Sequence, residues 1–384
     1  MTDALRFAQE LVRIPSVSRF EQDDLQTGEA ALTDFLEKLF GELGIRCMRQ
    51  PVVPGRANVV AYVQNPAAAR TVLFDAHQDT VPTVGMTIAP FGGEISNGRL
   101  WGRGACDVKG GMAAMIAALG RLAAERPRNA ASVILACTVD EENSFRGVKR
   151  LLEGPWPAAR PDMAIVAEPT LLRIIIAHKG LTRWKVSTLG KSCHSANPER
   201  GVNAVYLMAP VIAALEEHAR RIAARPAHPL LGPSTLSVGT ITGGSSVNTV
   251  PAFCELEVDR RLIPGESPES AFQECMGDVL SRVGRDYAVR FDGPSLAEPA
   301  LDTREQSETV QVAKTAVAEV LGSAVACGAP YGTDASTIAA GGIPAVVLGP
   351  GDIAQAHTPD EWIDVEEIEK AAEVYYRIAL AAGR

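Results

Sequence analysis

The sequence predicts an α/β protein with a mainly parallel central sheet and an inserted α+β domain of the ferredoxin-like kind. Two observations predict this fold class. First, continuous apolar runs at residues 133–139, 163–167 and 345–348 alternate with helical segments, which is typical of parallel strands buried on both faces. Second, the pattern between 181 and 294 changes to β-α-β-β-α-β, the order of a split βαβ unit. Because the run at 345–348 follows that segment, the segment is predicted to be inserted into the first domain.

The first domain is predicted to cover residues 1–180 and 295–384. Apolar residues at helical spacing predict one helix that ends at Pro15 and a longer one that ends at Gly44. The other elements expected there, besides the three apolar strands, are strands at 58–63 and 71–75, a glycine-rich hairpin and loop at 90–104, and a helix from about 107 to 124.

The inserted domain is predicted to cover residues 181–294. Residues 254–260 (CELEVDR) alternate in polarity, as a strand with one solvated face does. The other elements expected there are strands at 183–189, 234–242 and 287–291, and helices at 202–224 and 268–283.

Composition and charge exclude several classes of protein. The chain has 384 residues, 46% of them hydrophobic, and no uninterrupted apolar run near the ~18 residues of a membrane span. Asp3 and Glu10 among the first apolar residues favour an amphipathic helix over a signal peptide. A net charge of −9 without a basic stripe argues against nucleic acid as a partner. The seven cysteines are scattered and form no CxxC pair, so we expect a cytoplasmic protein without a thiolate zinc site.

Polar residues follow the apolar strands at one predicted edge of the sheet. His77 and Asp79 end the strand at 71–75, Glu141 and Glu142 follow the run at 133–139, and Glu168 follows the run at 163–167. A Gly/Pro loop after the last run leads to His357 in the same way. Ligands of open α/β sheets bind beyond the carboxyl ends of the strands, so these side chains are predicted to meet there.

Taken singly, each candidate also has a structural interpretation. Asp107 fits a helix N-cap, and Glu141 and Glu142 fit a solvated loop. A histidine followed two residues later by a carboxylate, as in His77 and Asp79, is a weak signal, although metal-bound imidazoles commonly donate their other N–H to a carboxylate. Two adjacent carboxylates can have different roles, since one can bind a metal ion while the other accepts a proton from water.

Taken together, these residues point to metal chemistry. Two histidines and three carboxylates form a mixed nitrogen and oxygen ligand set that suits a pair of Zn²⁺ ions, or Co²⁺ or Mn²⁺. Two such ions ~3.5–4 Å apart can clamp a hydroxide and polarise a carbonyl group. The sequence therefore predicts a metal-dependent hydrolase if the side chains converge, and an ordinary buried sheet with polar strand ends if they do not.

Five motifs resemble one known family in their order and spacing. These are AHQDTVP, GRGACDVKGGMAA, TVDEEN, AEPT and AHTPDEW. They resemble the dinuclear zinc deacylase and carboxypeptidase family, which includes acetylornithine deacetylase, succinyl-diaminopimelate desuccinylase, aminoacylase and glutamate carboxypeptidases. The resemblance covers nearly the whole chain and implies a zinc-peptidase-like catalytic domain with an inserted lid and dimerisation domain.

Matching the motifs implies a role for each residue in the catalytic domain. Asp107 is expected to bridge two metal ions, with His77 and Glu168 completing one site. Glu142 and His357 are expected to complete the other. The resemblance also implies Glu141 as general base, Asp79 as the residue that orients His77, and a cis peptide bond after Asp107.

The inserted segment carries further matches. GKSCHSANPERGVNA resembles the lid motif whose histidine, here His194, donates to the developing oxyanion and in dimers can reach the partner's active site. SVNTVPAFCELEVDRR resembles the segment that supplies an Asn and an Arg, here Asn248 and Arg261, to a substrate carboxylate. A surface salt bridge is the alternative for Arg261, and Arg260 is expected to face the other way. YGTDAS at 331–336 resembles a loop that lines the substrate site.

The resemblance favours a deacylase of N-acyl amino acids of the acetylornithine and succinyl-diaminopimelate branch, acting on small molecules and forming a homodimer through the lid domain. The segment FGGEISNGRLWGRGACDVKGG favours this branch, together with the DEEN and AEPT motifs. A dipeptidase or glutamate-type carboxypeptidase with the same metal chemistry is the alternative. A non-catalytic binding protein on this fold is a further one, which the complete ligand set and Glu141 argue against.

Overall fold

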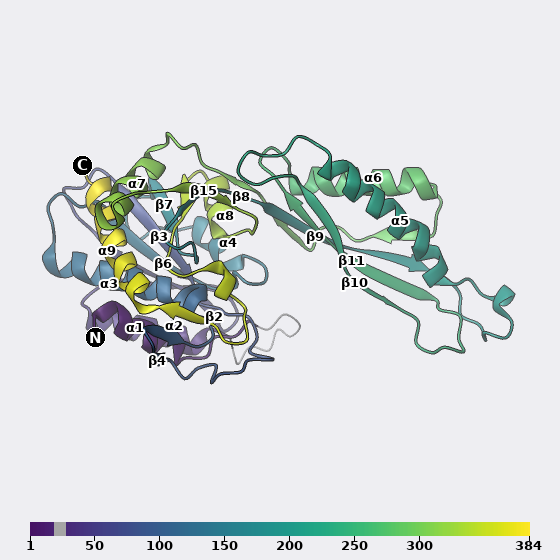
Figure 1. The fold of residues 1–384 in the computed structure, drawn as a ribbon, viewed down its shortest axis with the longest axis horizontal. Coiled ribbons are helices and arrows are strands. Elements are labelled where there is room, and N and C mark those ends of the chain that lie inside the picture. The colour runs from purple at the N-terminus through teal and green to yellow at the C-terminus, as the bar shows by residue number, and fades with distance from the viewer. Residues whose placement is uncertain (19–27) are drawn as a thin grey trace. The chain divides into compact units, whose positions relative to one another are not determined.

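The computed structural model describes residues 1–18 and 28–384, and the chain divides into two compact units (Figure 1). The first unit comprises residues 1–176, 303–327 and 333–384, and the second comprises 177–302 and 328–332. All seven cysteines lie within the described residues and are free. In the described part of the chain, no helix combines the length and the apolar character that crossing a membrane requires.

The larger sheet has a parallel centre and antiparallel margins. Its strand order is β1-β2-β6-β3-β7-β16-β8-β14, and β15 pairs with β8. Strands β6, β3, β7 and β16 run parallel to one another, whereas β1, β2, β8 and β14 pair in antiparallel fashion. The predicted α/β class is confirmed, with a mixed sheet. The strands are β1 (Arg46–Val53), β2 (Arg56–Val63), β3 (Thr71–His77), β6 (Ser132–Thr138), β7 (Met163–Val166), β8 (Ile174–His178), β14 (Leu301–Asp302), β15 (Ala326–Ala329) and β16 (Ala345–Val347).

Helices cover both faces of this sheet. One buried cluster joins α1, α2, α3, α7 and α9 to alternate residues of β3, namely Val72, Phe74 and Ala76. Helix α4 packs against β1 and β6, and α8 packs against β7 and β16. The helices are α1 (Asp3–Val12), α2 (Ala30–Glu42), α3 (Gly110–Glu125), α4 (Arg146–Leu152), α7 (Glu308–Leu321), α8 (Asp334–Ala340) and α9 (Val365–Ala382).

Sequence periodicity did not reveal β1. Its sequence RCMRQPVV contains Arg, Gln and Pro, and only Gln50 within it is buried. It lies at the margin of the sheet and pairs with β2 alone, so most of its side chains face solvent and form no apolar pattern. Proline is tolerated in such an edge strand, which explains Pro51. The predicted hairpin at 90–104 is present as β4 (Glu94–Ser96) and β5 (Arg99–Trp101), with β17 (Trp362–Asp364) paired to β5.

Helix α3 begins later than expected. It starts at Gly110, with Lys109 as its N-cap residue, so the N-cap interpretation of Asp107 is wrong. Asp107 and Val108 have non-helical backbone angles, and the peptide bond between them is cis, as the resemblance implied. The Asp107 carboxylate is therefore available for contacts elsewhere.

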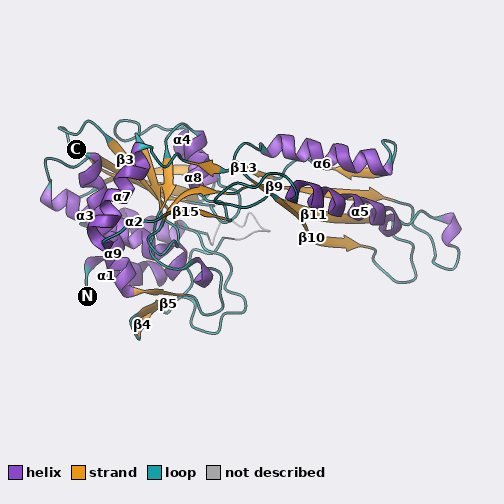
Figure 2. Cartoon of the chain, turned by 45° about the horizontal axis from the view of Figure 1, so that its top comes forward, coloured by secondary structure: helices purple, strands orange, loops and turns teal. Residues whose placement is uncertain are grey.

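The second unit has the predicted β-α-β-β-α-β order. Its sheet is antiparallel in the order β10-β11-β9-β12, with β13 paired to β9. Figure 2 shows both helices of this unit on one side of that sheet, where Trp184 and Phe272 pack edge to face at 5.4 Å. The elements are β9 (Gly180–Leu189), α5 (Ala204–Ala223), β10 (Thr235–Gly243), β11 (Phe253–Leu262), α6 (Pro268–Val283), β12 (Val289–Phe291) and β13 (Leu296–Glu298).

Candidate metal centre

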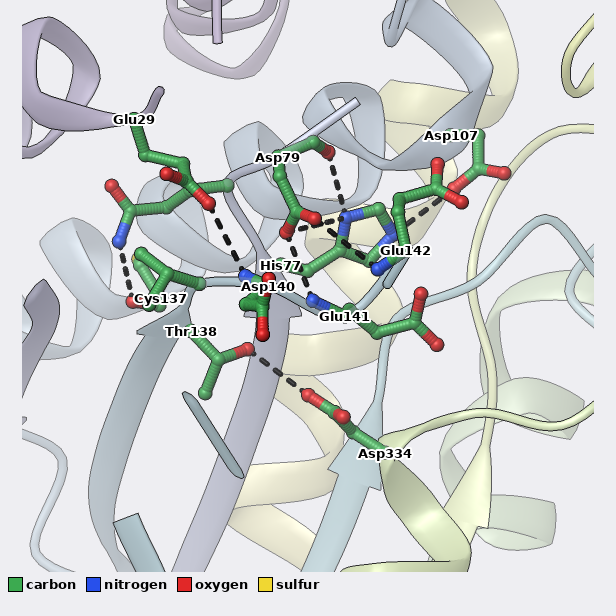
Figure 3. A network of polar contacts seen from close by, with 12 residues as sticks. Glu29, His77, Asp79, Asp107, Cys137, Thr138, Asp140, Glu141, Glu142 and Asp334 are labelled. Carbon is green, nitrogen blue, oxygen red and sulfur yellow. Dashed lines mark hydrogen bonds and ion pairs between the residues drawn. The ribbon is translucent and has the colours of Figure 1, made fainter. Parts of the chain in front are cut away.

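The carboxyl ends of the parallel strands bring the predicted side chains together, and Figure 3 shows His77, Asp107 and Glu142 among them. His77 is the last residue of β3, and Glu142 lies in the loop directly after β6. Glu168 follows β7, and the loop after β16 leads to His357. The sheet therefore places at one edge residues that are up to 280 positions apart in the sequence, from 77 to 357.

The first donor group consists of His77, Asp107 and Glu168. His77 Nε2 lies 3.0 Å from Asp107 Oδ1 and 3.9 Å from Glu168 Oε1. All three side chains are enclosed, with exposed fractions of 2%, 8% and 7%. The donor atoms lie within 4.8 Å of one another, as three ligands of one ion would.

The second donor group consists of Asp107, Glu142 and His357. His357 Nε2 lies 3.3 Å from Asp107 Oδ2 and 3.2 Å from Glu142 Oε1. Asp107 thus offers one oxygen to each group. Unlike the first group, the second reaches solvent, because the His357 side chain is 51% exposed.

Asp79 contacts both His77 and the loop after β6. His77 Nδ1 lies 2.9 Å from the backbone oxygen of Asp79 and 3.8 Å from its carboxylate Oδ1. Donation from Nδ1 to that carbonyl leaves Nε2 facing Asp107, where it donates to the carboxylate and, once deprotonated, could offer its lone pair to a metal ion. The carboxylate of Asp79 accepts hydrogen bonds from the backbone N–H groups of Glu141 at 3.1 Å and Glu142 at 3.2 Å. Asp79 therefore orients His77 through its main chain and fixes the neighbouring loop through its side chain.

Glu361 holds the backbone at Asp107. Its Oε1 accepts from the N–H groups of Cys106 at 2.9 Å and Asp107 at 3.1 Å. Its Oε2 accepts from Arg103 at 2.6 Å, and both members of this ion pair are buried. Sequence reasoning assigned no role to Glu361, although the residue lies within the AHTPDEW motif that also contains His357.

The electrostatics of the cluster favour added positive charge. Burial lowers the pKa of His77, but its hydrogen bond to Asp107 and the nearby carboxylates outweigh burial and raise the pKa well above its usual value. Hydrogen bonds to Asp107 and Glu142 raise the pKa of His357 to about 10. Burial and the neighbouring carboxylates raise the pKa of Glu168 well above its usual value. The protein without metal thus holds protons that divalent cations would displace on binding.

Glu141 belongs to neither donor group, although it adjoins the ligand candidate Glu142. It is 9% exposed, and burial is the largest of the causes that raise the pKa of its carboxyl group well above the usual value. A carboxylate with a raised pKa beside a cation site is suited to accept a proton from water. The role of general base that the resemblance implies for Glu141 stays a prediction.

The other predicted residues lie in the second unit. His194 forms an isolated β-bridge with Thr249, and the N–H of Ser195 donates to the backbone oxygen of Asn248 at 3.0 Å, so His194 and Asn248 lie near each other. Arg261 lies 29% exposed on β11 and pairs with Asp259 at 2.7 Å. Arg260 points to the opposite side, as predicted, where it is buried against Glu266.

The loop at 331–336 supplies a buried carboxylate to the first unit. Asp334, at the start of α8, is 2% exposed and accepts a hydrogen bond from Thr138 Oγ1 at 3.1 Å (Figure 3). Burial raises the pKa of Asp334 well above its usual value. Sequence reasoning marked this loop by resemblance but assigned no residue in it.

Comparisons with known proteins identify the family and the fold. The profile of the family described as peptidase family M20/M25/M40 matches residues 73–381. The chain is 33% identical over 372 residues to an acetylornithine deacetylase of Proteus mirabilis (strain HI4320), covering 95% of this chain and 93% of the relative. An M20 family metallo-carboxypeptidase, Sso-CP2 from Sulfolobus solfataricus, has a similar fold, with a TM-score of 0.81, 21% identity and full coverage of both chains. The YXEP protein of Bacillus subtilis, a dinuclear metal binding peptidase, has a TM-score of 0.70 at 17% identity, covering 98% of this chain and 96% of that one.

Proposed function

Because this chain belongs to peptidase family M20/M25/M40, we propose that it removes the acyl group from an N-acyl amino acid, as an acetylornithine deacetylase or succinyl-diaminopimelate desuccinylase does. The relatives over nearly the whole chain support a metal-dependent amidohydrolase that acts on a small molecule. The observation that carries the proposal is the Asp107 carboxylate, which offers one oxygen to each of two donor groups.

Two divalent metal ions fit the donor set. His77, Asp107 and Glu168 would hold one ion, and Asp107, Glu142 and His357 the other. We propose zinc for both positions, since imidazole and carboxylate ligands suit Zn²⁺; Co²⁺ and Mn²⁺ suit the same set. When bound, the metal ions supply a Lewis acid for the substrate carbonyl and lower the pKa of water.

The chain's own residues handle protons and orient the substrate. Glu141 accepts a proton from the attacking water and returns it to the leaving amine. Asp79 keeps Glu141 in place through the backbone N–H of that residue. His194 donates to the oxyanion, and Asn248 and Arg261 bind the carboxylate of the substrate, for which Arg261 exchanges its pairing with Asp259.

A variant series and a substrate panel test the proposal. Glu141→Ala should abolish turnover with the metal content near that of the wild type, whereas full activity would remove Glu141 from the mechanism. The panel consists of N-acetylornithine, N-succinyl-diaminopimelate, other N-acyl amino acids and simple dipeptides. Preference for dipeptides would favour the peptidase alternative. Absence of both turnover and bound metal would favour a binding protein on this fold.

We also propose a homodimer through the second unit. Strand β10 lies at the margin of its sheet, where its outer backbone groups can pair with another chain. Val205, Tyr206 and Ile212 on α5 and Ile241 on β10 are exposed by 38%, 76%, 37% and 52%, which is unusual for apolar side chains of this size. Tyr206→Asp should shift the sedimentation coefficient toward that of a monomer. A wild-type monomer at micromolar concentration would contradict the proposal.

The cytoplasmic location stays a prediction.

A further inference from the structure

Four consecutive backbone N–H groups after β6 each donate to a side-chain oxygen. Such a row is unusual, because loop N–H groups are generally bound by water or by other backbone oxygens. The pairs are Val139 with Asn58 Oδ1 at 3.1 Å, Asp140 with Glu29 Oε1 at 3.2 Å, Glu141 with Asp79 Oδ1 at 3.1 Å, and Glu142 with Asp79 Oδ2 at 3.2 Å. The backbone that carries Glu141 and Glu142 is thus fixed by side chains from β2, from the loop after β3 and from the N-cap residue of α2.

Asp140 is the strained point of this row. Its φ of +67° lies in the left-handed region, which a residue other than glycine adopts at a cost of about 1–3 kcal/mol. Such a conformation persists only where the surrounding contacts enforce it. For Asp140 these are the bond from its N–H to Glu29 and bonds to its carboxylate from Ser144 at 2.5 Å, Arg146 at 2.7 Å and Arg56 at 3.0 Å.

Glu29 and Arg56 form the buried base of this arrangement. Glu29 is fully buried, and the side chain of Arg56 is 16% exposed. Both guanidinium edges are used, since Nε and Nη2 of Arg56 donate to the Glu29 carboxylate while Nη1 donates to Asp140. Arg56 therefore bridges two buried carboxylates and sets the angle between them, which Lys, with a point charge, could not reproduce, while Arg146 is a second cation on Asp140.

We propose that Glu29, oriented by Arg56, is a positioning residue for Glu141 and Glu142, acting through the backbone N–H of Asp140. This inference rests on the proposed function, because it assumes the general base and the metal ligand named there. Glu29 touches neither donor group. It determines how the peptide at 140–142 is turned, and thereby where the two carboxylates that follow are directed. Residues that orient metal ligands commonly change metal affinity or activity by about 10–100-fold when removed.

The experiment compares Glu29→Ala with Leu36→Ala. Leu36 lies fully buried on α2, the helix that Glu29 caps, but contacts none of the four N–H groups. Zn²⁺ binding to the metal-free protein is measured by calorimetry, and kcat and KM are measured on the zinc-loaded protein. Glu29→Ala should weaken one of two zinc sites about 10–100-fold and lower kcat by a similar factor, with KM changed less than about threefold. Leu36→Ala should lower the melting temperature while kcat and both zinc affinities stay within about threefold.

Two results would overturn the inference. One is a Glu29→Ala protein whose zinc affinities and kcat match those of the wild type. The other is a Leu36→Ala protein that shows the same losses at an equal drop in melting temperature. If Glu29→Ala does not fold, Glu29→Gln tests whether Glu29 positions Glu141 and Glu142. It keeps an oxygen for Asp140 but loses the charge facing Arg56, so a zinc affinity lowered about 3–10-fold is expected and an unchanged one overturns the inference.

Failure of the proposed function gives a different result. If the wild type hydrolyses no compound of the panel but binds two zinc ions, the proposed reaction is wrong, and the calorimetric comparison still decides the role of Glu29. A wild-type protein that binds no zinc would overturn both.

Discussion

Glu361→Ala should destabilise the first unit more than any other single change at the Arg103–Glu361 pair. The substitution leaves Arg103, which is 3% exposed, without its carboxylate at 2.6 Å. It also removes the acceptor of the N–H groups of Cys106 and Asp107. Removing one partner of a buried ion pair typically costs about 3–5 kcal/mol, and we expect a loss in that range in the free energy of unfolding.

Arg103→Met should cost less, about 1.5–3 kcal/mol, because Glu361 keeps both backbone donors and loses one charged hydrogen bond. The double variant should be more stable than the sum of the two losses predicts, by at least about 1 kcal/mol, since the unpaired guanidinium is then absent. Its two N–H groups stay without an acceptor, so the wild-type stability should not return.

Urea denaturation of the metal-free protein measures these differences, since metal binding then contributes nothing to the apparent stability. A Glu361→Ala loss below about 1 kcal/mol, or an Arg103→Met loss larger than that of Glu361→Ala, would refute the assignment of Glu361 as the anchor of the Asp107 backbone.

Three further predictions concern the metal ions and pH. His77→Ala and His357→Ala should each reduce the bound zinc from two ions to one per chain, because each variant keeps all three residues of the other donor group. Elemental analysis after dialysis measures the bound zinc. Two tightly held ions in either variant would contradict the ligand assignment. Chelation of the wild type should lower its melting temperature by mass action, and the drop should shrink in both variants; an equal drop would mean that the lost ion contributes no stability. Burial lowers the pKa of His178 to about 4. Between about pH 6.5 and 4, the unfolded chain therefore binds a proton at this residue that the folded chain does not. As the pH drops through that range, the free energy of unfolding should fall by about 1.4 kcal/mol per pH unit because of this group. His178→Asn should make the slope of stability against pH shallower by that amount, and an unchanged slope would show that His178 is protonated in the folded state.

The sequence predicted the strand ends because in each case a short continuous apolar run is followed directly by polar residues. In β3, seven buried residues end at His77, and the same pattern recurs in β6 before the Glu pair. Parallel strands align these ends, so the local pattern placed the polar side chains of β3, β6 and β7 at one edge, whereas the part played by Asp107 came from the resemblance.

The supporting residues could not be predicted in this way. Glu361 acts on a backbone N–H 254 positions earlier in the sequence, and Glu29 acts on one 111 positions later. Nothing in the local sequence distinguishes Glu29 from a surface carboxylate, and the motif that contains Glu361 does not show which backbone groups it binds, because both contacts come from three-dimensional packing. The resemblance predicted that Asp79 orients His77, but not that its carboxylate fixes the backbone of the neighbouring loop.

The unequal exposure of the two donor groups has a kinetic consequence. His357 is half exposed and comes from a loop, whereas His77 ends a central strand and is almost fully enclosed. At the outer position, formed by Asp107, Glu142 and His357, an ion can lose one ligand to water while the others remain. We therefore expect fast exchange of the metal ion there, and slow exchange at the inner position, formed by His77, Asp107 and Glu168. When metal ions are scarce, the protein should therefore persist as a form that retains its inner ion, ready to recover the outer one without refolding.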